Sequence, residues 1–427
     1  MQTTPLIIGS LCVFGLLIGT LTCLRRKRLI DDLPTSKTQG VFIGLTELKG
    51  TAEIETPLTS YLGAVRCVEY HWQVEENWSR TVTYTDSKGI HSRSESGWTT
   101  VASGGEKPPF YLQDDTGVIR INPEGASITD LNVFSRNCKE SDPLYYAKGP
   151  RAAVPDSTHK RRFKENALLL HTMLYVIGQA QECKDVVAAE IAKDANAPLY
   201  IISIKTEKQI SSSYVRWAWL WVILGLLTTL GTVFISNPPE GTGNPLTWQP
   251  FAAGALIYFA ALAAGWTMTV YNSLITLRNR VNQAWSQVDI QLKRRSDLIP
   301  NLASCVEGYS SHEKAAQLLA AELRNQAEVY GETKEVRGYS NAIAAIAESY
   351  PALKADQSFL TLQKSLAETE QRIALARSYF NDIVTFYNTR LEIIPDRFVG
   401  AMARLFKQNT LKSTDLERAP VQVCLAA

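Results

Sequence analysis

Three long stretches without a charged residue constrain the fold of this chain most strongly. They are Leu6–Leu24, Trp217–Ser236 and Phe251–Val270, each 19 or 20 residues long. Because a helix rises 1.5 Å per residue, about 20 residues cross the roughly 30 Å of hydrocarbon in a bilayer. The sequence therefore predicts three transmembrane helices, at 6–24, 217–236 and 251–270, with an outer N-terminus at 1–5 and an outer loop at 237–250.

Clustered basic residues orient these spans. Arg25–Arg28 reads RRKR directly after the first apolar stretch, and residues 1–5 carry no charge. A cleaved signal peptide has the opposite order, with its positive charge before the apolar core. The loop 237–250 contains no Lys or Arg, and Lys and Arg stay on the cytoplasmic side. We therefore expect the N-terminus outside and 25–216 and 271–427 in the cytoplasm; the alternative for Arg25–Arg28 is an anionic-lipid or partner site.

Composition excludes several classes of protein. The 44 Lys and Arg residues nearly balance the 42 Asp and Glu residues, whereas nucleic-acid-binding proteins concentrate positive charge to displace counterions. With 45% hydrophobic and 20% charged residues, the chain is not disordered. The seven cysteines form no Cys-x-x-Cys pair, and the five histidines lack the spacing of metal ligands. We expect no nucleic-acid partner, no metal, no cofactor and no catalytic residue.

The region between the first two spans, 25–216, is predicted to be a β-rich domain with a barrel-like or sandwich-like fold. Val68–Val74 alternates apolar and polar residues, which is the pattern of a half-buried strand. A turn is expected at Ser103–Gly105 and a short helix at Glu165–Leu170. Further strands are expected at Phe110–Leu112, Val118–Ile121, Leu174–Ile177 and Leu199–Ile204, the first two joined by a turn at Asp114–Gly117.

Four short motifs of this region point to a known family. They are Phe110–Val118 (FYLQDDTGV), Asn122–Ala126 (NPEGA), Tyr175–Gly178 (YVIG) and Leu199–Ser203 (LYIIS). In order and spacing they resemble the GIDE domain, which lies between two membrane spans in a mitochondrial ubiquitin ligase and also occurs in bacterial proteins. The activity of that ligase belongs to a zinc-binding RING after the second span, and a RING needs closely spaced Cys and His ligands. This sequence has no such series.

The region 271–408 is predicted to be a cytoplasmic long-helix bundle, followed by a C-terminal tail at 409–427. Apolar residues recur in steps of three and four from Leu274 to Leu292, so the third span should continue as one long helix toward Pro300, with Asp297 as the N-cap of the next helix. Two shorter helices are expected at 298–330 and 336–350, which completes a four-helix bundle. A last helix carries a coiled-coil-like seam. Its members are Phe359, Leu362, Leu366, Thr369, Ile373, Ala376, Phe380, Ile383, Tyr387, Leu391 and Ile394.

The motifs of this region resemble the signature of the LemA family. They are Asn279–Val281, Ala284–Trp285, Val288–Asp289, Gln291–Arg295, Asp297–Leu302, Tyr350–Ala355, Leu362–Gln363, Thr369–Glu370, Ala376–Arg377 and Tyr387–Asn388. The resemblance implies a membrane helix that leads into a long-helix bundle, and it implies architecture more than chemistry. The candidate interaction residues of this signature are Arg280, Trp285, Asp289, Lys293, Arg294, Arg295, Asp297, Pro300 and Asn301.

The basic cluster Lys293–Arg295 has two interpretations. A straight helix would carry Arg294 about 36 Å beyond Val270, which is several Debye lengths from the bilayer and argues against lipid binding there. The cluster then serves either as charge at a helix C-terminus or as a contact with a partner.

Together these features predict an α+β membrane protein of the bacterial cytoplasmic (inner) membrane. We expect a non-catalytic scaffold or assembly protein that acts through its helical bundle, by forming a homo-oligomer or by binding another membrane protein, with membrane lipid as its surroundings. Two alternatives remain: a membrane-bound ubiquitin-ligase-like protein, and an adaptor or regulator of a membrane protease or sensor. Small residues expected at contacts between spans are Gly225, Gly231, Gly254 and Ala261.

Overall fold

The computed structural model confirms an α+β chain made of two compact units. One unit comprises Met1–Pro34 with Tyr214–Ala427, and the other comprises Thr35–Ser213. The residues that the structure describes are 3–86, 89–182, 189–195, 197–236, 248–309 and 357–411. Most of the predicted outer loop, the tail beyond 411 and residues 310–356, where most of the two shorter bundle helices were predicted, lie outside this set.

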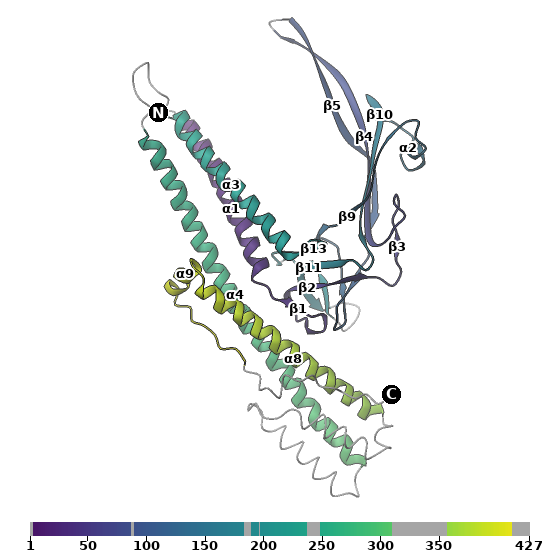
Figure 1. Cartoon of the computed structure of the whole chain (residues 1–427), viewed down its shortest axis with the longest axis vertical. Helices are drawn as coiled ribbons and strands as arrows, with labels where there is room; N and C mark the ends of the chain where they lie inside the picture. The colour runs from purple at the N-terminus through teal and green to yellow at the C-terminus, as the bar shows by residue number, and fades with distance from the viewer. Residues whose placement is uncertain are drawn as a thin grey trace. The chain divides into compact units, whose positions relative to one another are not determined.

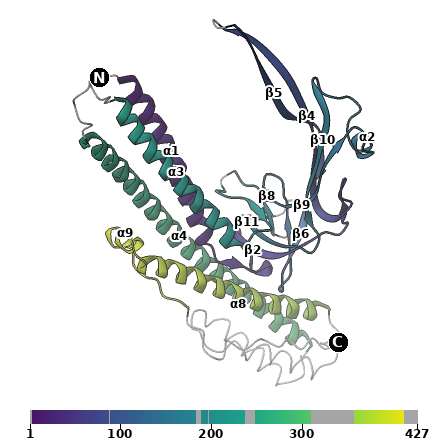
Figure 2. The same ribbon diagram turned by 45° about the horizontal axis from the view of Figure 1, so that its top comes forward.

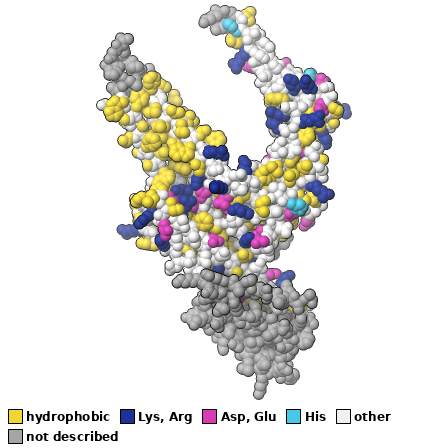
Figure 3. Space-filling view, viewed as in Figure 1, with side chains coloured by type: hydrophobic (Ala, Val, Ile, Leu, Met, Phe, Trp, Pro, Cys, Tyr) yellow, Lys and Arg dark blue, Asp and Glu magenta, His cyan; other side chains and the backbone are white. Residues whose placement is uncertain are grey.

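Three long helices dominate the first unit (Figure 1). They are α1 (Thr3–Asp31), α3 (Glu207–Ser236) and α4 (Gln249–Tyr309). Each contains one of the predicted charge-free stretches, and among the described residues these three are long and apolar enough to cross a membrane. Hydrophobic side chains cover the end of this helical arm that carries the N-terminus, and charged side chains gather at its opposite end (Figure 3).

Glycines allow the three helices to approach one another closely. A Cβ atom on Gly225 of α3 would lie 2.6 Å from the hydroxyl oxygen of Tyr258 on α4. A Cβ on Gly265 of α4 would lie 2.6 Å from Leu21 of α1, and one on Gly19 would touch the Trp221 ring at 3.4 Å. Each pair of helices therefore meets at a glycine, and at Gly225 and Gly265 an added Cβ would force the neighbouring side chain to move.

One prediction about helix α4 is wrong. The helix was expected to end near Asp297, with a new helix starting there, but α4 continues through Pro300 to Tyr309. Asp297 is a helical residue rather than an N-cap, since its carbonyl accepts a hydrogen bond from the Asn301 side chain at 3.2 Å. Proline removes one backbone donor and bends a helix without always ending it.

Two further helices belong to this unit, α8 (Gln357–Glu392) and α9 (Asp396–Met402). Helix α8 lies alongside α4 in both ribbon views (Figures 1 and 2). The predicted seam is confirmed for its central members, whereas Ile394 is 66% exposed because α8 ends two residues earlier. The buried seam residues are Leu366, Thr369, Ile373, Ala376, Phe380, Ile383 and Tyr387. The side chain of Phe359 lies outside the described set.

The second unit contains a small β-barrel. Five strands form a closed hydrogen-bonded ring in the order β2-β6-β7-β12-β11, and β11 pairs back to β2. These strands are β2 (Gly44–Glu53), β6 (Phe110–Gln113), β7 (Val118–Ile121), β12 (Ala189–Ala192) and β11 (Met173–Glu182). Attached to the ring are β1 (Thr35–Ser36), β13 (Ile201–Ser203) and β8 (Ser127–Thr129), with a 3-10 turn, η1, at Thr38–Gly40. Apolar side chains such as Leu48, Phe110 and Val176 fill the interior.

A second sheet carries a long two-stranded ribbon (Figure 1). Its strands are β3 (Leu58–Thr59), β4 (Arg66–Asp86), β5 (Gly89–Glu106), β9 (Leu131–Lys139) and β10 (Ser157–Leu169), with the short helix α2 (Leu144–Ala147) nearby in sequence. Strand β4 lies at the centre, paired with β10 on one edge and with β3 and β5 on the other. Beyond the part covered by β10, only β4 and β5 pair with each other.

Two predictions for this unit are wrong. The turn expected at Ser103–Gly105 is part of β5, because these glycines leave room for a neighbour: a Cβ on Gly104 would lie 2.9 Å from the Trp72 ring. The helix expected at Glu165–Leu170 lies almost wholly within β10. Side chains alternate between buried and half-buried along β10, and the Glu165 carboxylate accepts hydrogen bonds from the backbone amides of Leu62 and Gly63.

The strand and turn predictions elsewhere are confirmed, apart from one position of β4. Val68 and Val74 are fully buried in β4, but the predicted alternation fails at Glu69, which is also buried because the pairing of β4 with β10 shifts register beside it. The turn between β6 and β7 is held by Asp114, whose carboxylate accepts hydrogen bonds from the backbone amides of Thr116 and Gly117 at 2.7 and 3.0 Å. These bonds, together with those from Thr38, hold the pKa of Asp114 at about 2, although burial acts in the opposite direction.

Candidate functional site

A buried group of charges joins four helices of the first unit. The Arg28 guanidinium donates two hydrogen bonds to the Asp396 carboxylate, at 2.7 and 2.8 Å. Asp32, which directly follows α1, accepts hydrogen bonds from Arg390 and from the Ser273 hydroxyl, both at 2.7 Å. The residues Asp32 and Asp396 are 3% and 2% exposed, respectively. The end of α1 is thus fastened to α4, to α8 and to the start of α9, and we call this group the charge lock.

Local sequence explains how these side chains are presented. Arg28 and Asp32 are four residues apart at the end of α1, so they project from the same side. Asp396 lies in the first turn of α9, where a carboxylate interacts favourably with the helix dipole. The Arg28 guanidinium also lies 6.0 Å from the centre of the Trp266 ring, which is within reach of a cation–π interaction.

A cavity of about 320 Å³ lies beside the charge lock, between α1 and α4. Its lining combines apolar side chains, among them Ile18, Leu21 and Met268, with three arginines. The arginines are Arg25, Arg28 and Arg280. Arg280 donates a hydrogen bond of 3.3 Å to the backbone carbonyl of Asp32 rather than to its carboxylate. The cavity is therefore amphipathic and basic.

The predicted interaction residues are distributed along α4 rather than gathered in one place. Arg280 lines the cavity, and the Trp285 ring packs on Phe380 of α8 with centroids 5.5 Å apart. Arg295 lies 3.7 Å from the Glu370 carboxylate of α8, so it belongs to the contact between the two helices. Burial raises the pKa of Glu370, while Arg295 and Arg377 lower it. The remaining members are exposed: Asp289, Lys293, Arg294, Asp297, Pro300 and Asn301.

The predicted small residues differ in their surroundings. Gly225 packs against Tyr258, and a Cβ on Gly254 would lie 3.0 Å from Val233 of α3, so both serve contacts within the chain. Gly231 has no atom within 4 Å of an added Cβ. Ala261 is exposed. The last two therefore offer small-residue surface that the described part of the chain leaves uncovered.

A second buried ion pair stabilises the sheet that carries the ribbon. The Arg161 guanidinium donates to the Glu76 carboxylate at 2.9 and 3.1 Å, and both residues are fully buried. The Tyr145 hydroxyl donates to the same carboxylate at 3.0 Å, and Arg161 also donates to the backbone carbonyl of Pro150. Every strong donor and acceptor here is used within the protein, which is typical of a structural network.

Two other buried groups of this unit have perturbed acidities. Glu69 is 4% exposed, and burial raises its pKa to about 7, while Lys107 at 3.6 Å acts in the opposite direction. One of its carboxylate oxygens has no hydrogen-bond partner among the described residues. Burial also raises the pKa of the Cys67 thiol to about 11. Cys67 and Cys138 are buried free thiols.

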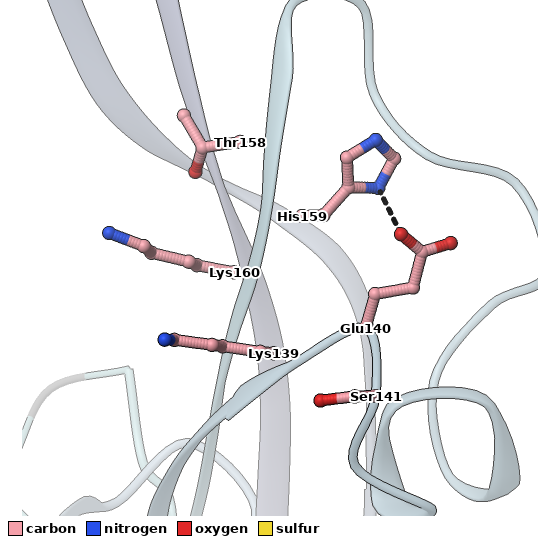
Figure 4. A pocket seen from close by; sticks show the side chains of 6 residues that line it. All are labelled: Lys139, Glu140, Ser141, Thr158, His159 and Lys160. Carbon is pink, nitrogen blue, oxygen red and sulfur yellow. Dashed lines mark ion pairs between the residues drawn. The ribbon is translucent and has the colours of Figure 1, made fainter.

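A shallow depression on the surface holds the groups shown in Figure 4. His159 points toward Glu140 from the opposite strand, with its Nδ1 atom 3.6 Å from a carboxylate oxygen. Lys139 and Lys160 point to the other side. Both members of the His159–Glu140 pair are about half exposed, so water screens the pair and it contributes little. In this depression we find no set of nucleophile, base and oxyanion donors.

Sequence reasoning missed the charge lock. Arg28 was interpreted only as part of the basic cluster after the first span. Its partner Asp396 lies 368 residues away, and Arg390 lies 358 residues from Asp32. The one available signal was the pair Arg28 and Asp32 at helical spacing directly after an apolar span.

Comparison with known proteins confirms both resemblances. A model of the LemA family matches residues 284–424, and the GIDE model, described as an E3 ubiquitin ligase, matches residues 79–235. No curated protein matches this chain. The LemA match includes Arg390 and Asp396, whereas their partners Asp32 and Arg28 lie outside both matches. The charge lock therefore joins a LemA-like segment to a helix that neither family model covers.

Proposed function

We propose that the chain is a non-catalytic membrane scaffold. Its apolar helices anchor a helical platform, formed by the later part of α4 with α8 and α9, on which partners assemble. The charge lock is the observation that carries this proposal. Its two ion pairs are buried, and separating such a pair leaves an uncompensated charge at a cost of about 3–5 kcal/mol. The anchor and the platform therefore move as one body, which suits a protein that positions partners at a membrane.

The proposal places α1, α3 and the first part of α4 in the bacterial cytoplasmic membrane, with the N-terminus outside. The basic cluster after α1 and the absence of Lys and Arg from 237–250 support this orientation. Cysteine labelling in intact cells, in a cysteine-free background, provides the test. A membrane-impermeant reagent should modify Gly243→Cys and leave Lys160→Cys and Gln283→Cys unmodified until the cells are opened. Modification of the last two in intact cells would overturn the topology.

We further propose that copies of the chain associate laterally in the membrane. The exposed small residues Gly231 and Ala261 support this, because small residues let helices of neighbouring subunits approach. Native mass spectrometry of the protein in nanodiscs should detect an oligomer that the double variant Gly231→Leu, Ala261→Leu weakens. The exposed position Leu227 supplies a matched control, since Leu227→Ile keeps the size of the side chain. A strictly monomeric wild-type particle in both nanodiscs and detergent would refute lateral association.

A second candidate function is ubiquitin transfer, and the match of residues 79–235 to the GIDE model supports it. The test is a transfer assay with the purified full chain, activating and conjugating enzymes, ubiquitin and ATP, together with a zinc determination. Stoichiometric zinc or chain-dependent ubiquitin conjugates would replace the scaffold proposal. A third candidate, an adaptor of a membrane protease or sensor, requires a second membrane protein that co-purifies in fixed stoichiometry.

A further inference from the structure

The cavity between α1 and α4 changes character along its length. Ile18, Leu21 and Met268 line it where the two helices lie within their charge-free stretches. Arg25 and Arg280 line it further along, beyond the end of those stretches. From Met268 to Arg280 the helix rises about 18 Å. An occupant that covers the whole cavity must therefore be apolar at one end and anionic at the other.

The positive charge of this cavity is only partly compensated by the protein. The carboxylates of Asp32 and Asp396 already bind Arg390 and Arg28. Among the described residues no carboxylate lies within ion-pair distance of Arg25 or Arg280. Arg280 is half-buried and makes its hydrogen bond to a neutral backbone carbonyl. The Asp32 carboxylate also lines the cavity and attracts Arg280, but it is hydrogen-bonded to Arg390. Three arginines thus face one shared carboxylate, so a further anionic group here would be stabilising.

We propose that this cavity binds an anionic glycerophospholipid, whose phosphate lies between Arg25 and Arg280 and whose acyl chain lies along Ile18, Leu21 and Met268. Guanidinium groups present planar pairs of donors that match the oxygens of a phosphate. Free phosphate shares this chemistry, but it would leave the apolar end uncovered. Arg25 directly follows the first charge-free stretch, which is the depth at which headgroups lie. Arg280 lies ten residues past Val270, about 15 Å along the helix, so its long side chain must extend back toward the headgroup. The proposal rests on the membrane insertion proposed above.

The test uses the full chain in nanodiscs that contain phosphatidylcholine with a small fraction of phosphatidylglycerol. The protein is transferred to mild detergent, and native mass spectrometry measures which lipids remain bound. Phosphatidylglycerol should be retained by the wild type in preference to phosphatidylcholine. Because one charge-assisted contact is removed, Arg280→Gln should lower this affinity about tenfold. Arg280→Lys should retain much of the binding.

Two further variants separate loss of the site from loss of the fold. Arg25→Gln changes an exposed side chain, so it should weaken lipid binding without lowering the melting temperature. Arg294→Gln removes an exposed arginine far along α4 and should leave binding unchanged. Equal retention of phosphatidylglycerol in Arg25→Gln, Arg280→Gln and the wild type would overturn the proposal, as would equal retention of both lipids by the wild type.

A separate arm distinguishes the source of the phosphate and the underlying membrane insertion. Inorganic phosphate at millimolar concentration should not displace the lipid; displacement would assign the site to free phosphate instead. Labelling of Gly243→Cys from outside the cell reports insertion independently of the lipid. Correct labelling without lipid selectivity would refute only the lipid site, whereas failed insertion would refute the proposed function as well.

Discussion

Replacing Asp396 by asparagine should strongly destabilise the helical unit. The Asp396 side chain is 3% exposed and accepts two hydrogen bonds from Arg28, while Arg390 lies 3.8 Å from the same carboxylate. The variant keeps the shape of the side chain and removes its charge, so Arg28 stays buried without its hydrogen-bonded counter-charge and keeps only the more distant attraction of Asp32 and Asp31. Loss of one partner from a buried pair costs about 3–5 kcal/mol. Since Arg28 keeps 13% exposure, we expect a loss near the lower end, about 3 kcal/mol.

The assay is thermal unfolding of the full chain in detergent and in nanodiscs, followed by tryptophan fluorescence. Arg28→Met should lower the free energy of unfolding by less than Asp396→Asn does, because Asp396 would still face Arg390. The melting temperature of the double variant should be close to that of Asp396→Asn. The combined loss of stability should be smaller than the sum of the two single losses, since both changes break the same interaction. Lys407→Met is the matched control, because its ion pair with Glu392 is 60% exposed on both sides. The reasoning would be refuted if Asp396→Asn had the same melting temperature as Lys407→Met. It would also be refuted if the stability losses of Asp396→Asn and Arg28→Met were additive in the double variant.

Three other predictions use the same melting assay. Phe380→Asp should separate α8 from α4, because it buries an unpaired charge against Trp285. Burial raises the pKa of Glu69 to about 7 from about 4.5, so the folded state binds the extra proton between these values. The free energy of unfolding should fall as pH rises through this window, and Glu69→Gln should flatten the dependence between pH 5 and pH 8. Gly225→Ala should lower the melting temperature by overpacking against Tyr258, whereas Gly231→Ala in the same helix should leave it unchanged.

The sequence was most informative where a pattern repeats locally. Charge-free stretches of about 20 residues mark the apolar helices, because membrane-spanning length and composition are local properties. The seam of α8 was also predictable, since each buried position such as Ile373 or Ile383 follows its predecessor by three or four residues. The turn between β6 and β7 was predictable for the same reason, because Asp114 organises it through bonds to its immediate neighbours.

The errors arose where a tertiary contact overrides a local signal. Gly104 and Gly105 indicate a turn in isolation, but in β5 they make space for the neighbouring strand. The run from Glu165 to Leu170 has the composition of a helix, yet the pairing of β10 with β4 and β9 determines its conformation. The contacts of the charge lock could not be predicted from local spacing, since Arg28 and Asp396 come from opposite ends of the chain.

Helix α4 acts geometrically as a lever. Its 61 residues correspond to a rod of about 90 Å, and about 58 Å of it extends beyond Val270. The first 29 residues past Val270 contain neither glycine nor proline, because Pro300 is the first proline of that extension and Gly308 its first glycine. A change of about 10° in the tilt of the apolar part would therefore carry the end of this run, just before Pro300, roughly 8 Å sideways. Under the proposed membrane insertion, small adjustments to bilayer thickness would thus become large displacements along the part of α4 beyond the apolar stretch.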